Sequence, residues 1–270
     1  RSKFNSLKLQ YGYCEQFNSP NIANICEDKS KTYSYLKEYY KRDVLLIDER
    51  TKQTDVNQFV KHHKKFIFKP LFGHSGQGIK IFDEADIDNG FVDEKLSLFG
   101  PFIIEEIINQ AQEMAVLHSQ SINTVRIATL NMNGLVYIYG GAVRIGIGNS
   151  NIDNAGAGGI YASIDTNIGV IVSKAMDNKS NRYVLHPDSK VILPGFKLPM
   201  WDEAIKLIKK LATTIPGANL LAWDLAYSKD GWCLVEANDI GEQYLLQAPE
   251  QQGVKPQLIK MFDQIDIKYN

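Results

Sequence analysis

The spacing of apolar residues predicts helices at the start of the chain and strands after them. The stretch "KTYSYLKEYYKRDVLLI" (31–47) predicts a helix followed by a short strand, and apolar positions 56, 59 and 60 predict a helix over 55–65. Short apolar runs then predict strands at 66–68, 79–82 and 100–108.

From residue 120 onward, strands joined by turns dominate the pattern. "TVRIATLNMNGLVYIYGGAVRIG" (124–146) predicts two strands around Asn133-Gly134, and "LLAWDLAYSKDGWCLVEAND" (220–239) predicts a hairpin at Asp230-Gly231. Two helices are expected, an amphipathic one within 198–216 and a last one near 256–263.

These elements together predict an α+β fold made of two lobes that each mix strands and helices. We expect a short N-terminal helical segment over residues 1–48, a first lobe over 49–119 and a second lobe over 120–270.

Composition narrows the function classes without choosing one. The chain has 270 residues, of which 44% are apolar and 23% charged, so it can bury a sizeable core. Its 30 basic and 31 acidic residues nearly cancel, which argues against a nucleic-acid-binding protein. No apolar run reaches the length of about 18 residues that a membrane span needs, and no signal peptide is visible. We therefore expect a cytoplasmic protein.

The stretch "FIFKPLFGHSGQGIKIF" (66–82) joins two apolar strands through a glycine-rich loop. A Walker A loop would need Lys-Ser or Lys-Thr where Ile79 stands, and a Rossmann loop would lead into a helix. The remaining interpretation is a flap whose backbone N–H groups close over phosphates, with Lys69 supplying positive charge. An exposed hairpin with a surface lysine stays open as the alternative.

The hairpin at 220–239 carries three residues that favour a metal site. Glu236 and Asn238 share one face of their strand, and a turn at residue 230 would place Asp224 opposite Glu236. Two carboxylates facing each other repel unless a cation lies between them, and oxygen ligands suit Mg²⁺. The alternative is a pair of solvated carboxylates, but the apolar neighbours on both strands make it less attractive.

Other charged residues interrupt apolar strands as well. Glu105 and Glu106 follow "GPFII", and a surface turn would explain them. Arg126 and Arg144 each lie among apolar residues, so each needs an anion if it faces the interior, or lies on the solvent face if it does not.

The histidine and cysteine positions give little support for metal or redox chemistry. His62 and His63 are adjacent on a lysine-rich helix end, which favours a solvated basic helix terminus over a metal site. Cys14, Cys26 and Cys233 have no metal-ligand spacing, so we expect thiols in a reducing compartment.

Read in order, these features resemble the ATP-grasp superfamily. The shared pattern is a Lys-Pro strand, a glycine flap, a Glu-Glu strand, arginines on later strands and a closing Asp…Glu-x-Asn. The closest likeness is the sugar-transfer-associated branch, which "SINTVRIATL", "DNAGAGGI", "LPMWDEA" and "AWDLAYSKDGWCLVEAND" resemble. The likeness covers roughly residues 25–245 and implies two α+β lobes that clasp ATP between antiparallel sheets.

The resemblance implies which residues contact the phosphates of ATP. Lys69 would contact the α- and β-phosphates, and Lys29 would match a second phosphate-binding lysine, with Lys31 as its competitor. The flap would cover the β- and γ-phosphates, with its histidine and serine near the γ-phosphate. The flap residues are Gly73, His74, Ser75, Gly76 and Gly78.

The remaining nucleotide and metal contacts are implied in the same way. Adenine would be held through one carboxylate and main-chain groups, and Glu113 would bind the ribose. Asp224, Glu236 and Asn238 would hold one or two Mg²⁺ ions. The residues expected around adenine are Glu105, Glu106, Ile107 and Ile108.

The expected activity is an ATP- and Mg²⁺-dependent carboxylate–amine ligase that works through an acyl phosphate, in the modification of polysaccharide or cell-envelope precursors. Arg126 would orient the carboxylate substrate and Arg144 would steady the oxyanion. A sugar kinase on the same scaffold and a non-catalytic nucleotide-binding module are the alternatives. Residues 1–48 are too short for the substrate-binding domain of many ATP-grasp proteins, so the acceptor stays open. The sequence does not reveal the oligomeric state.

Overall fold

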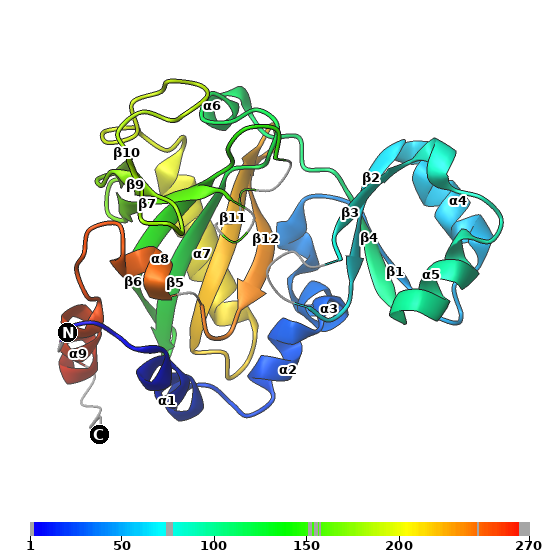
Figure 1. Ribbon diagram of the computed structural model, residues 1–270. Helices are drawn as coiled ribbons and strands as arrows, with labels where there is room; N and C mark the ends of the chain where they lie inside the picture. The colour runs from blue at the N-terminus through cyan, green and yellow to red at the C-terminus, as the bar shows by residue number, and fades with distance from the viewer. Residues whose placement is uncertain are drawn as a thin grey trace. The chain divides into compact units, whose positions relative to one another are not determined.

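A computed structural model describes residues 3–73, 78–150, 153, 156, 158–241 and 243–264. His74, Ser75 and Gly76 of the predicted flap lie outside these residues. Contacts within the chain divide it into a smaller unit, Asn24–Asn109, and a larger unit, Arg1–Ala23 with Gln110–Asn270. Each unit has its own sheet (Figure 1).

These units divide the chain elsewhere than the expected boundaries at 48 and 119, which stay a prediction. The difference arises because α1 (Leu7–Phe17) packs into the larger unit: Tyr13 and Phe17 contact Phe262 near the chain's other end. Such a contact joins residues that are far apart in sequence, and local apolar spacing carries no information about it.

The smaller unit contains, in its described part, a four-stranded antiparallel sheet with the strand order β1-β4-β2-β3. Its strands are β1 (Val44–Ile47), β2 (Lys65–Pro70), β3 (Lys80–Asp83) and β4 (Phe102–Glu106). Its helical elements are α3 (Lys29–Tyr40), α4 (Gln53–His62), the 3₁₀ turn η1 (Glu84–Asp86) and α5 (Phe91–Phe99); α2 (Ile22–Glu27) spans the junction of the two units.

Helices α4 and α5 lie on one face of this sheet (Figure 1). Their Val56, Val60 and Phe91 pack against strand residues Phe66 and Phe68, all of them buried. The amphipathic spacing of the helices and the alternation of the strands meet in this core, and the core holds β2 and the start of the flap in place.

The larger unit contains, among the residues described, an eight-stranded antiparallel sheet whose main order is β10-β9-β7-β6-β5-β11-β12, with β8 beside β7. Its strands are β5 (Thr124–Met132), β6 (Leu135–Ile145), β7 (Ile160–Asp165), β8 (Val170–Ile171), β9 (Ala175–Met176), β10 (Arg182–Tyr183), β11 (Leu220–Ser228) and β12 (Gly231–Asn238).

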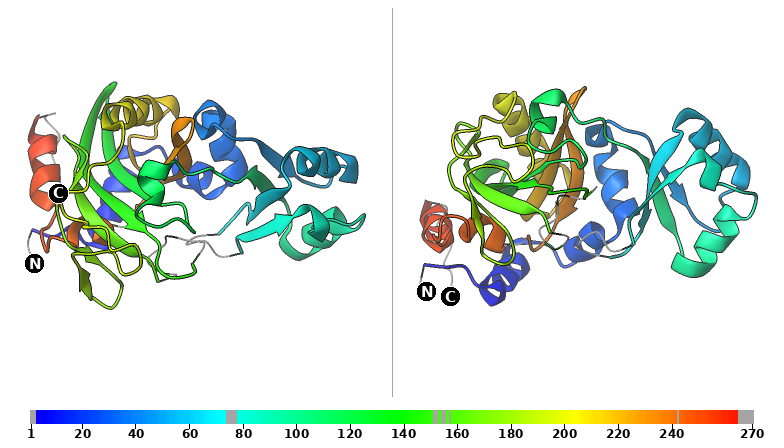
Figure 2. Two further views of the ribbon diagram at one scale, coloured as in Figure 1. Left: turned by 90° about the horizontal axis from the view of Figure 1, so that it is seen from above. Right: turned by 45° about the horizontal axis from the view of Figure 1, so that its top comes forward.

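Helices cover both faces of the larger sheet. Helix α7 (Trp201–Thr214) lies on one face, and α1, α8 (Gln243–Gln247) and α9 (Lys255–Gln264) pack on the other (Figure 2). The short α6 (Gln112–Ala115) precedes β5. In the part of the chain that the structure describes, each helix is too short or too polar to cross a membrane.

The hairpin turns fall where glycine allowed them to be predicted. Asn133 and Gly134 both have positive φ angles, 54° and 87°, as the tight turn between β5 and β6 requires. Gly231 (φ 87°) follows the turn between β11 and β12. The predicted helices and hairpins of the larger unit are confirmed to within a few residues at their ends.

We expect Phe68→Ala to lower the free energy of unfolding by about 3–5 kcal/mol, because it removes a fully buried ring from the core of the smaller unit. Ile81→Ala is the matched control on the same hairpin: Ile81 is 49% exposed, so its loss should cost less than about 1 kcal/mol. Urea unfolding of both variants measures the difference. Equal losses would show that Phe68 does not hold this core together.

Candidate functional site

The larger unit contains a buried carboxylate that is held by two arginines. Asp224 is fully buried and accepts two hydrogen bonds from Arg126, Nε to Oδ1 and NH2 to Oδ2, both at 2.7 Å. Arg144 donates to the same Oδ2, also at 2.7 Å. The two strand arginines therefore face the interior, and Asp224 is the anion that each of them needs.

Strand register brings these three residues together. Asp224 on β11 lies opposite Arg126 on β5, and Thr124 on β5 lies opposite Arg144 on β6. Directly opposite residues of an antiparallel pair share one face, so the charges gather over three neighbouring strands.

Arg144 has further partners on its own side of the network. Its Nε donates to the hydroxyl of Thr124 at 2.8 Å, and Asp153 lies 3.8 Å from the same nitrogen. Asp153 also accepts hydrogen bonds from the backbone N–H and the hydroxyl of Thr124. Burial raises the pKa of Asp153, whereas the charge of Arg144 favours its ionised form.

The pairing of Asp224 with the arginines sets its ionisation. Burial alone would raise the pKa of this carboxyl, but the guanidinium groups of Arg126 and Arg144 outweigh burial and hold the pKa well below its usual range. Asp224 is therefore a permanent anion that orients both arginines.

Glu236 on β12 lies opposite Asp224 on β11, as the sequence predicted, but the pairing does not follow from the position of the turn alone. The hairpin closes with Ser228 opposite Gly231, which alone would bring Val235 to Asp224. A β-bulge between Asp224 and Leu225 shifts the register by one residue and brings Glu236 there instead.

The chemistry of Glu236 and Asn238 fits a cation. Partial burial is the main cause that raises the pKa of Glu236, and the neighbouring charge of Asp224 raises it further. The two arginines do not offset this rise, because they are engaged mainly by Asp224. The amide nitrogen of Asn238 is buried without a hydrogen-bond partner among the described residues. If that amide were rotated, it would present an oxygen ligand in place of the nitrogen. Carboxylate and amide oxygens are ligands that suit Mg²⁺.

The smaller unit contains a second buried ion network, around Lys69. Its ammonium group donates to Oε2 of Glu105 at 2.9 Å, and the same oxygen accepts hydrogen bonds from Arg42. Burial raises the pKa of Glu105, but the positive charges of Arg42 and Lys69 outweigh it and hold the pKa below its usual value. This carboxylate is therefore committed to two cations, and its predicted contact with adenine stays a prediction.

Lys29 lies near the start of the predicted flap. Its ammonium group donates to the carbonyls of Leu71 and Gly73, each at 3.3 Å. Lys31, its competitor in the sequence, pairs instead with Asp28 and Asn24 in its own part of the chain.

The described ends of the flap need glycine. Gly73 and Gly78 have φ angles of 129° and 74°, which side chains rarely adopt. A Cβ atom at Gly78 would lie 2.9 Å from Cγ of Pro70, so the base of the flap closes tightly against the Lys-Pro strand.

The residues expected around adenine and ribose are less buried. Glu106 ends β4 and is only partly buried, and Ile107 and Ile108 follow it at intermediate exposure. Glu113 is exposed in α6 of the larger unit.

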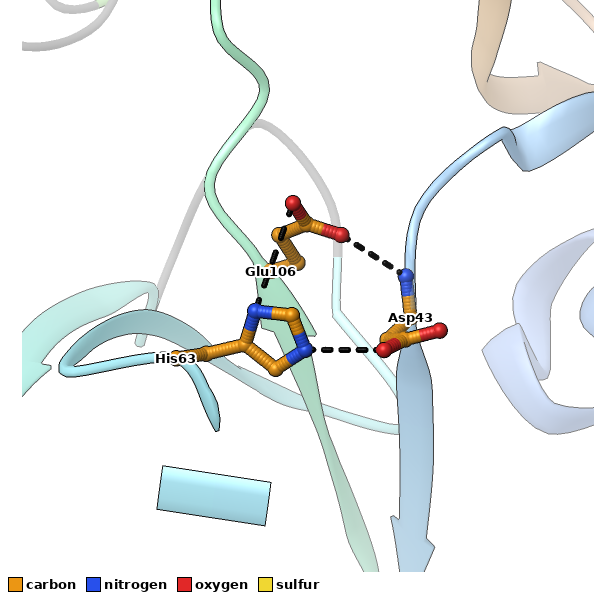
Figure 3. Close-up of side chains that lie close together, drawn as sticks. All are labelled: Asp43, His63 and Glu106. Atoms are coloured by element: carbon orange, nitrogen blue, oxygen red, sulfur yellow. Dashed lines mark hydrogen bonds and ion pairs between the residues drawn. The ribbon is translucent and has the colours of Figure 1, made fainter. Parts of the chain in front are cut away.

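His63 differs from the expected solvated helix end, because it lies between two carboxylates (Figure 3). Its Nε2 lies 2.8 Å from Oδ2 of Asp43, and its Nδ1 lies 4.0 Å from Oε1 of Glu106. These three side chains are near enough to one another to hold a metal ion. The two ring nitrogens point in diverging directions, and each already faces a carboxylate: Nε2 faces Asp43 and Nδ1 faces Glu106. The trio is better understood as a group of polar contacts that joins the end of α4 and the start of β1 to the end of β4.

Sequence reasoning missed Arg42, Thr124 and Asp153. Arg42 stands in a polar stretch without periodicity, and Thr124 looks like any β-branched strand residue. Asp153 begins the quoted stretch "DNAGAGGI", so its position in a family motif was a usable signal. A pocket of about 230 Å³ near His118 and Asp188 in the larger unit contains none of the predicted site residues.

Solved structures with the same fold include several ligases. D-alanyl-alanine synthetase A from Vibrio cholerae O1 biovar eltor matches 90% of this chain with a TM-score of 0.55 and 13% identity. The ATP-grasp ligase PsnB, solved with a phosphomimetic variant of its minimal precursor, Mg and ADP, matches 96% at the same TM-score and identity. D-Alanine-D-alanine ligase from Helicobacter pylori matches 94%, with a TM-score of 0.51 and 16% identity.

The chain spans 62% of the Vibrio synthetase and 67% of the other two proteins. At these identities the likeness shows the fold, which confirms the predicted α+β ATP-grasp architecture. No curated protein sequence matches the chain significantly. The sequence model described as "Sugar-transfer associated ATP-grasp" matches residues 8–264. The chain therefore belongs to the sugar-transfer associated ATP-grasp family.

Proposed function

We propose that this protein is an ATP- and Mg²⁺-dependent ligase that joins a carboxylate to an amine in the modification of polysaccharide or cell-envelope precursors. The observation that carries the proposal is the buried Arg126–Asp224–Arg144 network with Glu236 and Asn238 beside it. It combines fixed cations for an anionic substrate with oxygen ligands for a metal on one sheet face. Family membership and the fold of the ligases described above support the same assignment.

The proposed reaction has two steps and needs no covalent intermediate with the enzyme. The substrate carboxylate attacks the γ-phosphorus of ATP, the bond to the β-phosphate oxygen breaks, and an acyl phosphate and ADP form. The amine then attacks the acyl carbon, loses a proton and expels inorganic phosphate, which leaves an amide.

The residues of the larger unit have separate tasks in this proposal. Arg126 orients the substrate carboxylate, and Arg144 stabilises the negative charge that develops on the acyl oxygen and the departing phosphate. Asp224 keeps both guanidiniums in position. Glu236 and Asn238, with Asp224, would hold Mg²⁺, which supplies charge neutralisation at the phosphates when bound.

Lys69 of the smaller unit is proposed to bind the phosphates of ATP, with the flap and Lys29 as further phosphate contacts. Glu106 and the backbone at 107–108 are proposed to bind adenine, and Glu113 the ribose. In this proposal the substrates are small molecules, and the amine and carboxylate partners are of the sugar-linked kind that the family's name suggests.

We expect the protein with MgATP and its carboxylate substrate to release ADP and, when hydroxylamine is added, to form a hydroxamate. Hydroxylamine replaces the amine and traps the acyl phosphate. A screen of amino acids and uronic acids, with ADP release and hydroxamate measured together, checks this. A stable phosphoester product with no hydroxamate would identify a kinase on the same fold and contradict the ligase assignment.

We expect Glu236→Gln to lower the affinity for Mg²⁺ and to reduce turnover by about 100-fold or more, because it removes a charged metal ligand. Glu203→Gln is the matched control: Glu203 is exposed on α7, away from the network. Titration of ADP release with Mg²⁺ separates the two variants. Unchanged turnover in Glu236→Gln would remove this residue from the metal site.

The affinity for Mg²⁺ should fall as the pH is lowered through the pKa of Glu236, which is raised above its ordinary value. Below that pKa the carboxyl is protonated and cannot bind a cation. Isothermal titration with Mg²⁺ between pH 7 and pH 5 should therefore show weakening in the native protein and a smaller pH dependence in Glu236→Gln. An equal dependence in both proteins would place the titrating group elsewhere.

We expect Asp224→Asn to lower the free energy of unfolding by about 3–5 kcal/mol, because it leaves two buried guanidiniums without their shared anion. Asp202→Asn, at an exposed position in the first turn of α7, should change stability by less than about 1 kcal/mol. Chemical unfolding of both variants at neutral pH measures this. A small loss for Asp224→Asn would mean that the arginines find other partners.

A further inference from the structure

One carboxylate oxygen in the smaller unit accepts hydrogen bonds from two different cations. Oε2 of Glu105 accepts from Nε and NH2 of Arg42 at 2.9 and 2.8 Å, and from the ammonium group of Lys69 at 2.9 Å. The fork of the guanidinium and the point charge of the ammonium meet at this oxygen.

All three side chains are removed from water. The side chains of Arg42, Glu105 and Lys69 are 3%, 2% and 11% exposed. Glu105 lies on β4 between the partners it joins: β1, which Arg42 precedes, pairs with β4 on one side, and β2, which carries Lys69, pairs with it on the other. The trio therefore spans three adjacent strands.

Arg42 is fixed independently of Glu105. Its NH1 donates to the carbonyl of Tyr40 at 3.1 Å, and its guanidinium carbon lies 4.5 Å from the centre of the Tyr40 ring. An arginine held in this way keeps the carboxylate of Glu105 in one position, so the place where Lys69 finds its partner is also fixed.

The charge of the trio matters as much as its geometry. Two cations and one carboxylate leave a net charge of +1, whereas Lys69 and Glu105 alone would form a neutral buried pair. A neutral pair attracts an anion weakly, and a buried carboxylate with a single cation would hold that cation strongly. Arg42 thus allows Lys69 to be held in place and still to favour an approaching phosphate.

We propose that Arg42 is a positioning residue for Lys69, which acts through Glu105 and leaves the lysine able to bind phosphate. The inference rests on the proposed ATP-dependent function and adds to it a residue that determines nucleotide affinity without being one of the proposed ATP contacts.

The test is a double-mutant cycle on ATP affinity, measured by isothermal titration of the full chain with ATP and Mg²⁺. Arg42→Met should weaken binding about 10-fold in the native background, which corresponds to about 1.4 kcal/mol. In a Lys69→Met background the same change should weaken binding less than about 2-fold, because the residue through which Arg42 acts is gone. Arg42→Lys keeps the positive charge but loses the forked guanidinium. In the native background it should weaken ATP binding by more than about 2-fold and less than about 10-fold.

Unfolding curves of each variant separate this role from a purely structural one, because a structural loss lowers stability without changing the ATP affinity of the folded protein. An equal effect of Arg42→Met in both backgrounds would overturn the positioning role while leaving ATP binding intact. A folded native protein that does not bind ATP at all would overturn the proposed function, and this inference with it. Should Arg42→Met fail to fold, the Arg42→Lys cycle carries the same decision.

Discussion

A carboxylate that is buried in a sheet must find cations to replace the water it has lost, and this constraint organises both units of the protein. Asp224 gathers Arg126 and Arg144 across three strands of the larger sheet, and Glu105 gathers Arg42 and Lys69 across three strands of the smaller one. Each carboxylate lies on a strand that is paired on both sides. Arg126 and Lys69 come from the adjacent strands β5 and β2, whereas Arg144 lies on β6, one strand further, and Arg42 precedes β1.

The two networks differ in the charge that remains. In the smaller unit the cations exceed the carboxylate, which suits a site for phosphate. In the larger unit Asp153 and Glu236 add negative charge near the two arginines, so three carboxylates surround two guanidinium groups. The proposed nucleotide and the proposed divalent cation have charges complementary to these two networks, so the proposal agrees with the family to which the chain belongs.

Arg42 and Asp43, which are consecutive in the chain, make polar contacts on opposite faces of the sheet of the smaller unit. Arg42 pairs with Glu105 in the interior, whereas Asp43 next to it pairs with Glu106 and His63 in a more exposed position (Figure 3). The start of β1 is thereby fastened to the end of β4 twice. Because Lys69 depends on Glu105, the contacts of Asp43 with Glu106 and His63 help to keep the buried Glu105 network in register.

Sequence pattern predicted much of this fold, since alternation and turn residues are local signals. Asn133-Gly134 located one hairpin. Lys69, a charged residue in an apolar strand, is buried, so the alternative of a surface lysine is wrong, and its contact with phosphate stays a prediction. Arg42 could not be found in this way, because its partner lies 63 residues further along the chain and its surroundings lack periodicity. Strand β10 has only two residues, which are likewise too few for a period to show.

The bulge beside Asp224 has a consequence for the whole hairpin. On the turn side of it, Trp232 and Leu234 belong to the face that packs against α7, where Trp232 contacts Trp201. Beyond it, Glu236 and Asn238 belong to the face of Asp224. The even-numbered residues of β12 therefore change face at the bulge. Those before it belong to the core, and those after it belong to the site. If β12 paired without the bulge, Val235 would lie opposite Asp224, and Glu236 and Asn238 would turn to the face that packs against α7. The bulge, as much as the composition of β12, thus determines which of its side chains lie beside Asp224.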